Sequence, residues 1–597
     1  MTPRAEFLGQ WRAVRDGAAS DADLMVQPFP GLRSFWQRES DLFFGRERQI
    51  ADLLRALATR KVNFVLGGSG SGKSSLVRAG LIPRLITASV EPQPGAWYAV
   101  EFRPGEAPSS QLFEAIMRQI IQPVLAFDDD VAQNQLAHRY FALQEAFGVK
   151  LDGLDPTDAR QACRDRLGQF LFDGDVINID AVIAFADSQL AQLDKLLSRG
   201  AQSAPPNLLI LVDQFEEVFE GKVNAPDRDM LISLIKQVWK RNPNRLYLIV
   251  TMRSEELHRC SEFEGLTEVI NGSLYLLDLV EASDLVQAMV GPASRILKAW
   301  GLDYAEPVTP DAIATLQQTY HESAYTASSA DRLPLIQHLL TLVWHRAVER
   351  WAEEPASSPL QIHVSDIQAI EGWTDREGPL RACLTINADR LLKKAIVEAK
   401  RATGIPAGAA ESLIQAAYCT LARRDDRGNP KRDFATLEDM LEVSGVADRE
   451  RKITHSDRRS LKVLRIALDL FQHANLVGTI EEEGRVKYNV NHEAFIRGWR
   501  KYGEWLARAR ECEDRLIGVD EELREPAAAP RRARAFDLMM ELVFADRAHR
   551  AALIVTEDSA LLLDDVLGPD STFSWTWARR VLAHNDSSEN RMTERIL

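Results

Sequence analysis

A glycine-rich segment between residues 67 and 74 carries the strongest chemical signal in the sequence. Its letters, GGSGSGKS, fit the pattern G-x-x-x-x-G-K-[ST] of a phosphate-binding loop. The glycines let the backbone curl so that successive N–H groups face phosphate oxygens. Lys73 is then expected to reach the β- and γ-phosphates of a nucleotide, and Ser74 to bind Mg²⁺.

The elements on either side of this loop are those that a phosphate-binding loop requires. The apolar run Val62–Leu66 predicts a buried strand directly before it. Residues 75–78 open a helix, whose N-terminus favours anions. The alternative is a glycine-rich turn that contains a lysine by chance, and the flanking strand and helix argue against it.

A second strand supplies the acid that a magnesium site needs. The apolar run Asn207–Val212 ends at Asp213, which is expected to hold a water on Mg²⁺. The next residue is Gln214, whose amide can orient a water but cannot accept its proton. We favour Glu216 as the carboxylate that activates water, with Glu217 as the alternative; slow hydrolysis is a third reading.

A third strand, Leu246–Arg253, ends in a cation. Open α/β sheets bind ligands at the carboxyl ends of their strands, so Arg253 is expected to sense the γ-phosphate. The plainer alternative is a surface ion pair. The run Trp97–Phe102 predicts a further, structural strand.

Composition sets the frame for these motifs. The chain has 597 residues, a formal net charge of -15 and 45% hydrophobic residues, which indicates a globular protein of several domains. It contains no apolar stretch of membrane-spanning length and no apolar signal core near its start. Five scattered cysteines without a CxxC pair are typical of reduced thiols, so we expect a cytoplasmic protein without a membrane partner.

In this order, the segments resemble the STAND class of signalling P-loop NTPases and, more narrowly, the bacterial novel STAND family. The resemblance covers roughly residues 27–510. The matching stretches are residues 30–35, 42–47, 67–85, 103–105, 213–217, 251–253, 292–293, 333–335 and 492–499.

The resemblance implies roles for residues that spacing alone would not single out. Gly45 and Arg46 would lie near the adenine, although taken alone they are only a turn and the start of a helix. Pro334 would contact the nucleotide, but Arg332 stands where the family usually has a glycine. His492 would touch the β-phosphate of ADP and lock the resting state; the alternative is an ordinary histidine near a helix N-cap or in the core.

The candidate site therefore has three overlapping sets of residues. The catalytic set is Lys73, Asp213, Glu216 and Arg253. The set that binds ATP or ADP is Gly45, Arg46, Gly67, Gly70, Gly72, Lys73, Ser74, Ser75, Pro334 and His492. The Mg²⁺ set is Ser74 and Asp213.

The expected fold class is an α/β P-loop NTPase domain, with a parallel sheet and helices on both faces, followed by an α-helical domain, a winged-helix domain and a small helical segment. A lead of residues 1–26 precedes the NTPase domain at 27–275, which carries a helical insertion at about 122–203. The helical domain spans 276–375 and the winged-helix domain 376–510. A linker at 511–530 leads to a small helical module at 531–597.

The winged-helix prediction depends on a local pattern. A helical run from Arg458 to His473 precedes two strand-like segments, residues 476–480 and 485–490, with a turn at residues 482–484. Such a helix followed by a hairpin and another helix is typical of winged-helix domains.

The leading hypothesis is a nucleotide-controlled switch. ADP would be clamped by the P-loop and winged-helix domains, and a trigger would open this form. ATP would then bind, and the opened protein would assemble with itself or engage a protein effector or sensor in trans. The resemblance places this in bacterial signalling or anti-phage defence, with slow ATP hydrolysis as the reset.

Two rivals stay open. A DNA-binding loader, transposition ATPase or transcription regulator would use cations such as Arg458, Arg459, Lys462 and Arg465, or those at residues 531–534. The net charge of -15 disfavours a broad grip on nucleic acid. A constitutive motor or metabolic ATPase is disfavoured by Gln214.

Overall fold

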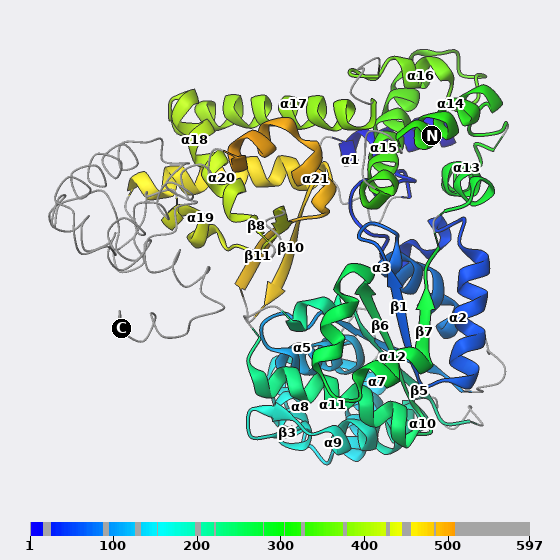
Figure 1. Cartoon of the computed structure of the whole chain (residues 1–597), viewed down its shortest axis with the longest axis vertical. Coiled ribbons are helices and arrows are strands. Elements are labelled where there is room, and N and C mark those ends of the chain that lie inside the picture. The colour runs from blue at the N-terminus through cyan, green and yellow to red at the C-terminus, as the bar shows by residue number, and fades with distance from the viewer. Residues whose placement is uncertain are drawn as a thin grey trace, which may run out of the picture. The chain divides into compact units, whose positions relative to one another are not determined.

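The computed structural model divides the chain into two compact units, which we describe separately (Figure 1). One unit is Phe35–Ala288; the other joins Met1–Ser34 to Met289–Leu597. The structure describes residues 2–15, 25–87, 95–125, 133–151, 153–197, 204–219, 223–278, 280–303, 305–323, 329–373, 379–424, 430–443, 455–482 and 485–507.

A five-stranded parallel sheet organises the first unit. Its strand order is β2-β5-β6-β1-β7, and every neighbouring pair is parallel. The strands are β1 (Val62–Gly67), β2 (Trp97–Phe102), β5 (Asn207–Val212), β6 (Leu246–Arg253) and β7 (Leu274–Leu276). The four strands expected from apolar runs are confirmed, whereas the three-residue edge strand β7 was not predicted.

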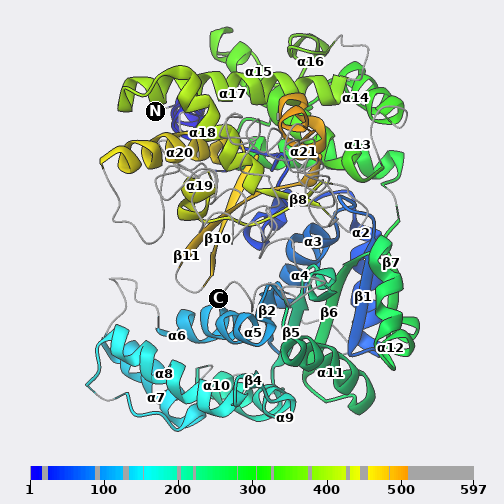
Figure 2. The ribbon, with the colours of Figure 1, turned by 60° about the vertical axis from the view of Figure 1, so that its left-hand side comes forward.

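Helices cover both faces of this sheet, as expected, because alternate strand residues point to opposite sides (Figure 2). Val65 packs with α2 (Glu47–Thr59), η2 (Leu76–Leu81) and α4 (Ile82–Thr87). Phe64 and Leu66 pack with α5 (Pro108–Ile116), η3 (Met117–Ile121), α11 (Ala225–Arg241) and α12 (Leu266–Ser273). Burial on both faces explains why β1 and β5 are continuous apolar runs rather than alternating ones.

The first unit also contains additional helices between β2 and β5. They are α6 (Gln122–Leu125), α7 (Gln133–Phe147), α8 (Pro156–Leu171), α9 (Ile179–Ala184), η4 (Phe185–Gln189) and α10 (Leu190–Leu197). A two-residue pair of strands, β3 (Phe172–Asp173) and β4 (Val176–Ile177), interrupts them. The sequence has three consecutive aspartates at residues 128–130 in this region, and they lie outside the described residues.

Short helical turns follow the strand ends that the sequence singled out. The loop after β1 enters α3 (Lys73–Ser75), which continues into η2 and α4. η5 (Phe215–Phe219) follows β5, and η6 (Ser254–Glu262) follows β6. The predicted site residues of this unit therefore gather at one edge of the sheet, where three parallel strands end.

The second unit is mainly helical. Its helices before residue 404 are α1 (Pro3–Arg15), α14 (Pro310–Glu322), α15 (Ser329–Glu353), α16 (Val364–Gln368) and α17 (Pro379–Thr403). The chain passes between the units twice: once between Ser34 and Phe35, just before η1 (Gln37–Leu42), and once within α13 (Ala282–Ala299). α1 is an integral part of this unit, since Phe7 and Trp11 are buried and the Trp11 indole Nε1–H donates to His345 Nδ1 at 3.1 Å.

A hairpin and its flanking helices lie near the C-terminal end of the described part of this unit. β10 (Val477–Glu482) pairs antiparallel with β11 (Arg485–Val490), after α20 (His455–His473) and before α21 (Glu493–Gly498). The predicted helix and both predicted strands are confirmed. Earlier elements are α18 (Ala407–Thr420), β8 (Ala422–Arg424), β9 (Pro430–Arg432) and α19 (Leu437–Val443).

Several predictions fall on residues that the structure does not describe. They are the turn at residues 483–484, the linker at 511–530, the helical module at 531–597 and Cys512. The other four cysteines are buried free thiols, as expected. Within the described residues, no helix is long and apolar enough to cross a membrane.

Candidate functional site

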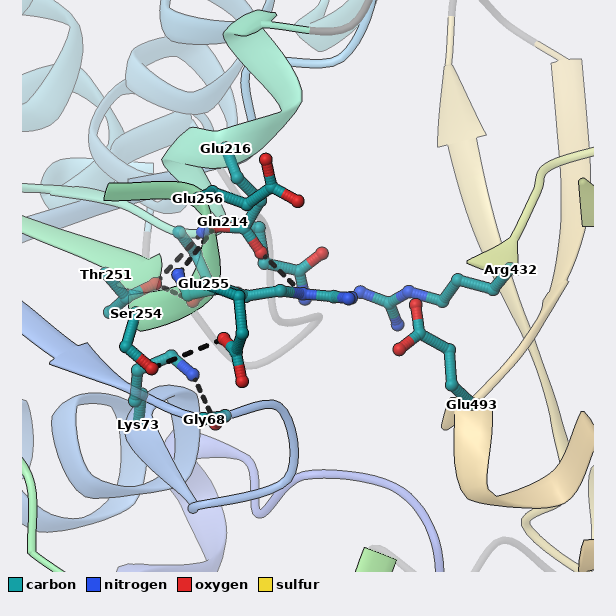
Figure 3. A network of polar contacts seen from close by, with 12 residues as sticks. Gly68, Lys73, Gln214, Glu216, Thr251, Ser254, Glu255, Glu256, Arg432 and Glu493 are labelled. Carbon is teal, nitrogen blue, oxygen red and sulfur yellow. Dashed lines mark hydrogen bonds and ion pairs between the residues drawn. The ribbon is translucent and has the colours of Figure 1, made fainter. Parts of the chain in front are cut away.

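The phosphate-binding loop is closed around its own lysine. Gly70 and Gly72 have φ of 70° and 90°, a left-handed conformation that glycine adopts without steric cost. The Lys73 ammonium donates to the carbonyl oxygens of Gly67 at 2.7 Å and Gly68 at 2.8 Å (Figure 3). The loop therefore folds as the motif predicts, with a cation held against its backbone.

Charged neighbours act on this lysine. Burial lowers the pKa of Lys73, and the Arg253 guanidinium lowers it further. The carboxylates of Glu216 and Glu255 oppose this effect and favour the charged ammonium. Glu255, in the turn after β6, did not stand out in the sequence (Figure 3). Lys73 thus lies in a partly buried group of charges at the strand ends.

Asp213 is the centre of the acidic side of the site. Its Oδ1 accepts hydrogen bonds from Ser74 Oγ at 2.7 Å and Thr251 Oγ1 at 2.6 Å. Its Oδ2 accepts from an Arg78 terminal nitrogen at 2.9 Å and lies 3.6 Å from Arg103 Nε. The carboxylate is wholly buried, so these four partners replace the water it has lost.

The partners of Asp213 decide its charge. Burial alone would raise the pKa of Asp213, but the charges of Arg78 and Arg103 and the hydroxyls of Thr251 and Ser74 lower it to about 2. Asp213 is therefore ionised at neutral pH. A hydroxyl beside an ionised carboxylate is an oxygen donor set that suits Mg²⁺.

The segment before α2 meets the phosphate-binding loop. Gly45 has φ of 82°, and a Cβ there would lie 2.2 Å from the Asp284 carbonyl oxygen, so only glycine fits. Arg46 is 5% exposed and donates to the Ser71 carbonyl oxygen at 3.1 Å. Ser75 Oγ accepts from the Phe35 N–H at 3.2 Å, which ties the same segment to the loop.

The turn after β5 holds Gln214 in an uncommon conformation. Its φ is 62°, in the left-handed region that costs a non-glycine residue about 1–2 kcal/mol. Its N–H donates to Thr251 Oγ1 at 2.9 Å (Figure 3). Thr251 thus joins the turn to Asp213 and holds the backbone of Gln214 in place.

Glu216 and Arg253, both predicted to act on the nucleotide, bind each other. Glu216 Oε1 accepts from Arg253 Nε at 3.0 Å, and Glu216 is 3% exposed. Glu217 turns elsewhere, and its Oε2 accepts from the Gly105 N–H at 3.3 Å. The structure therefore brings both predicted residues to the strand ends, as one ion pair.

His492 and Pro334 belong to the other compact unit. His492 is the N-cap of α21, where its Nδ1 accepts from the Ala494 N–H at 3.0 Å. Burial lowers the pKa of His492 to about 4, so the ring is neutral at pH 7. Pro334 is buried within α15, two residues after Arg332. Their roles toward a nucleotide stay predictions.

Sequence reasoning missed Arg78 and Thr251 as partners of Asp213, although two signals could have found them. Arg78 lies four residues after Ser74 and therefore shares its helix face. β5 and β6 are parallel with Val212 beside Val250, so Thr251 directly neighbours Asp213. The contact of Arg103 with Asp213 depends on the loop after β2 and has no comparable local signal.

Together, the parallel sheet, the glycine loop with Lys73, and the Ser74–Asp213 pair define a P-loop NTPase. The chain matches the Novel STAND NTPase 1 family over residues 28–529. It therefore belongs to the novel STAND NTPases, as the sequence motifs indicated, and family membership supports nucleotide binding.

The chain also has more distant similarities. The taurine import ATP-binding protein TauB of Pseudomonas putida is 26% identical over 235 residues, which are 38% of this chain and 75% of the relative. A Walker-type ATPase of Pyrococcus abyssi is 14% identical with a TM-score of 0.30, over 78% of this chain and 97% of that one. The ORC1 protein of Aeropyrum pernix, solved in complex with DNA, is 13% identical with a TM-score of 0.31, over 78% and 96%.

Proposed function

We propose that this protein is an ATP/ADP-dependent molecular switch of the STAND type. The observation that carries the proposal is the Ser74–Asp213 contact of 2.7 Å at the mouth of the Lys73 loop. This contact places Lys73, the cation expected to bind phosphate, next to Asp213, the ionised carboxylate expected to act at the Mg²⁺ site. The ATP-binding relative and the family match support the same nucleotide.

Each residue of this edge has a proposed task. Lys73 and the loop N–H groups bind the β- and γ-phosphates. Mg²⁺ would be held by Ser74 and by a water on Asp213, and it would supply charge stabilisation at the phosphates. The backbone that faces the nucleotide is held in place by Gly45, Arg46 and Ser75. Gln214 orients water but cannot accept its proton, which supports slow hydrolysis.

The resting state is the part of the proposal that depends on the resemblance. His492 would donate from Nε2 to the β-phosphate of ADP, and Pro334 would contact the nucleotide. The Ala494 N–H on Nδ1 supports this role, because it requires an unprotonated Nδ1 and leaves the proton of a neutral ring on Nε2. The hairpin β10–β11 between α20 and α21 supports a winged-helix domain as the carrier of His492.

The output that we propose for the switch is the one that the family resemblance suggests. A trigger would favour the ATP-bound form, which would assemble with itself or engage an effector or sensor protein in trans. Bacterial signalling or anti-phage defence, in the cytoplasm, is the setting that we propose. Hydrolysis then returns the protein to the ADP form.

The direct test is nucleotide binding by the whole chain. Lys73→Ala should weaken ATP and ADP binding at least about 100-fold, because charge-assisted phosphate contacts of a buried loop are lost. His492→Ala should speed ADP release while ATP affinity stays within about twofold. Wild-type protein that binds neither nucleotide in calorimetry, with or without Mg²⁺, would refute the proposal.

One observation keeps DNA binding as a second candidate. Arg458, Arg459, Lys462 and Arg465 are all exposed along α20, the helix before the hairpin. Four phosphate contacts would give a salt slope of about -3 to -4 in log K against log salt. Gel-shift titrations of duplex DNA at several salt concentrations test this. Absence of binding at low salt would exclude it.

A further inference from the structure

The two glutamates of the turn after β5 bind different neighbouring strands. Glu216 uses both oxygens on Arg253: Oε1 accepts from Nε at 3.0 Å and Oε2 from the backbone N–H at 3.3 Å. Glu217 Oε2 accepts from the Gly105 N–H in the turn after β2. Each carboxylate therefore holds the end of a strand that flanks β5.

Burial makes the Glu216–Arg253 pair a fixed feature. Glu216 is 3% exposed and the Arg253 side chain 17% exposed. Removing one partner would leave the other charge in a largely water-free place, which is unfavourable. The contact at Nε restrains the guanidinium, and the contact at the backbone N–H holds the main chain of the same residue against Glu216.

Arg253 stands beside the phosphate-binding loop. In the parallel pairing of β6 with β1, Arg253 is in register with Gly67, the first residue of that loop. Both members of the pair act electrostatically on the Lys73 ammonium, in opposite directions. The pair is thus close enough to the phosphates' binding place for its orientation to matter there.

We infer that Glu216 is a positioning residue that holds Arg253 for the γ-phosphate of ATP, and that it is not the base that accepts a proton from the attacking water. This inference rests on the proposed nucleotide function. It also explains why a turn that already has Gln214 after Asp213 retains a buried carboxylate: the carboxylate serves to orient the cation.

The inference is tested on the full chain with Glu216→Gln, Arg253→Ala and the double variant. Affinities for ATP and ADP and the single-turnover hydrolysis rate are measured for each. Both single variants should lower the ratio of ATP to ADP affinity about tenfold, with ADP affinity unchanged. The double variant should be no worse than Arg253→Ala, because both changes remove the same interaction.

A general base would give a different pattern. Glu216→Gln would then slow hydrolysis by about 10²-fold or more, leave the affinity ratio intact, and multiply the effect of Arg253→Ala. That outcome overturns the inference. Arg253→Lys, which keeps the charge but cannot reproduce the Nε contact, should also lower the ratio and serves if Arg253→Ala does not fold.

Two controls separate the possible failures. Asp180→Asn removes an exposed carboxylate that pairs with Arg241 in the same unit, and it should leave both affinities unchanged. If wild-type protein binds no nucleotide, the proposed function fails. If wild type binds both nucleotides and Glu216→Gln leaves their ratio unchanged, only the positioning role fails.

Discussion

At the residue scale, the Thr251 hydroxyl connects two parts of the site. Thr251 Oγ1 donates to Asp213 Oδ1 at 2.6 Å and accepts from the Gln214 N–H at 2.9 Å. One buried oxygen therefore supports both the magnesium-side acid and the left-handed turn that follows it. Loss of the hydroxyl would remove the acceptor of the partly buried Gln214 N–H and leave Asp213 with one partner fewer.

Thr251→Val should therefore weaken Mg²⁺-dependent ATP binding and lower the free energy of unfolding of this unit by about 1–3 kcal/mol. The change keeps the branched shape, so the effect reports the hydroxyl rather than a cavity. Denaturant unfolding and ATP calorimetry at fixed Mg²⁺ measure the two effects. Thr251→Ser, which keeps the hydroxyl, is the matched control; equal loss in both variants would contradict the argument.

At the element scale, α15 contains a buried histidine that makes the stability of its unit depend on pH. His338 is 2% exposed, and neither of its ring nitrogens has a hydrogen-bond partner among the residues that the structure describes. Burial lowers the pKa of His338 from 6.5 to about 4. Its ring stays neutral in the folded protein over a pH range in which the unfolded chain takes up a proton.

The sign of the pH effect follows from this difference. Above pH 6.5 the ring is neutral in both states, and the folded unit has its full stability. As the pH falls from 6.5 to 4, only the unfolded state gains the proton, so stability falls by about 3 kcal/mol. His338→Leu should remove this loss while changing stability little at pH 7. Denaturant unfolding followed by the fluorescence of the buried Trp344 and Trp351, at pH 7 and 4.5, measures it; equal acid loss in the variant would contradict it.

The elements that bear the site were the most predictable part of the chain. Apolar runs identified β1, β5 and β6 because strands buried on both faces need continuous hydrophobic sequence, whereas β2 is buried only in part. Parallel strand ends then placed Lys73, Asp213 and Arg253 at one edge. The pairing of Glu216 with Arg253 was not predictable, since it depends on the path of a short turn. β7 is too short to leave a periodic signal.

At the scale of the whole molecule, the first residues of the chain belong to the same compact unit as residues after 288. The predicted lead of residues 1–26 contributes α1 and residues 25–26 to the unit that also contains α15. The Trp344 indole Nε1–H donates to the Val26 carbonyl oxygen at 3.0 Å, and Arg4 donates to the Glu354 carbonyl oxygen at 2.9 Å. Contacts over more than 300 residues of sequence leave no local pattern, which is why the sequence did not assign the lead to the unit that contains α15.

The last prediction concerns the unit that joins Met1–Ser34 to Met289–Leu597. Trp11 is 1% exposed and donates to His345 on α15, so Trp11→Ala creates a cavity and removes a buried hydrogen bond. We expect a loss of about 3–5 kcal/mol in the unit that contains α1 and α15. Hydrogen exchange followed by mass spectrometry should show faster exchange in peptides of α1 and α15, with β1, β5 and β6 unchanged. Because Lys73 and Asp213 lie in the other unit, ATP binding by their P-loop should persist at temperatures where the variant's α15 already exchanges freely. Simultaneous loss of protection in α15 and β5 would instead mean that the two units unfold as one.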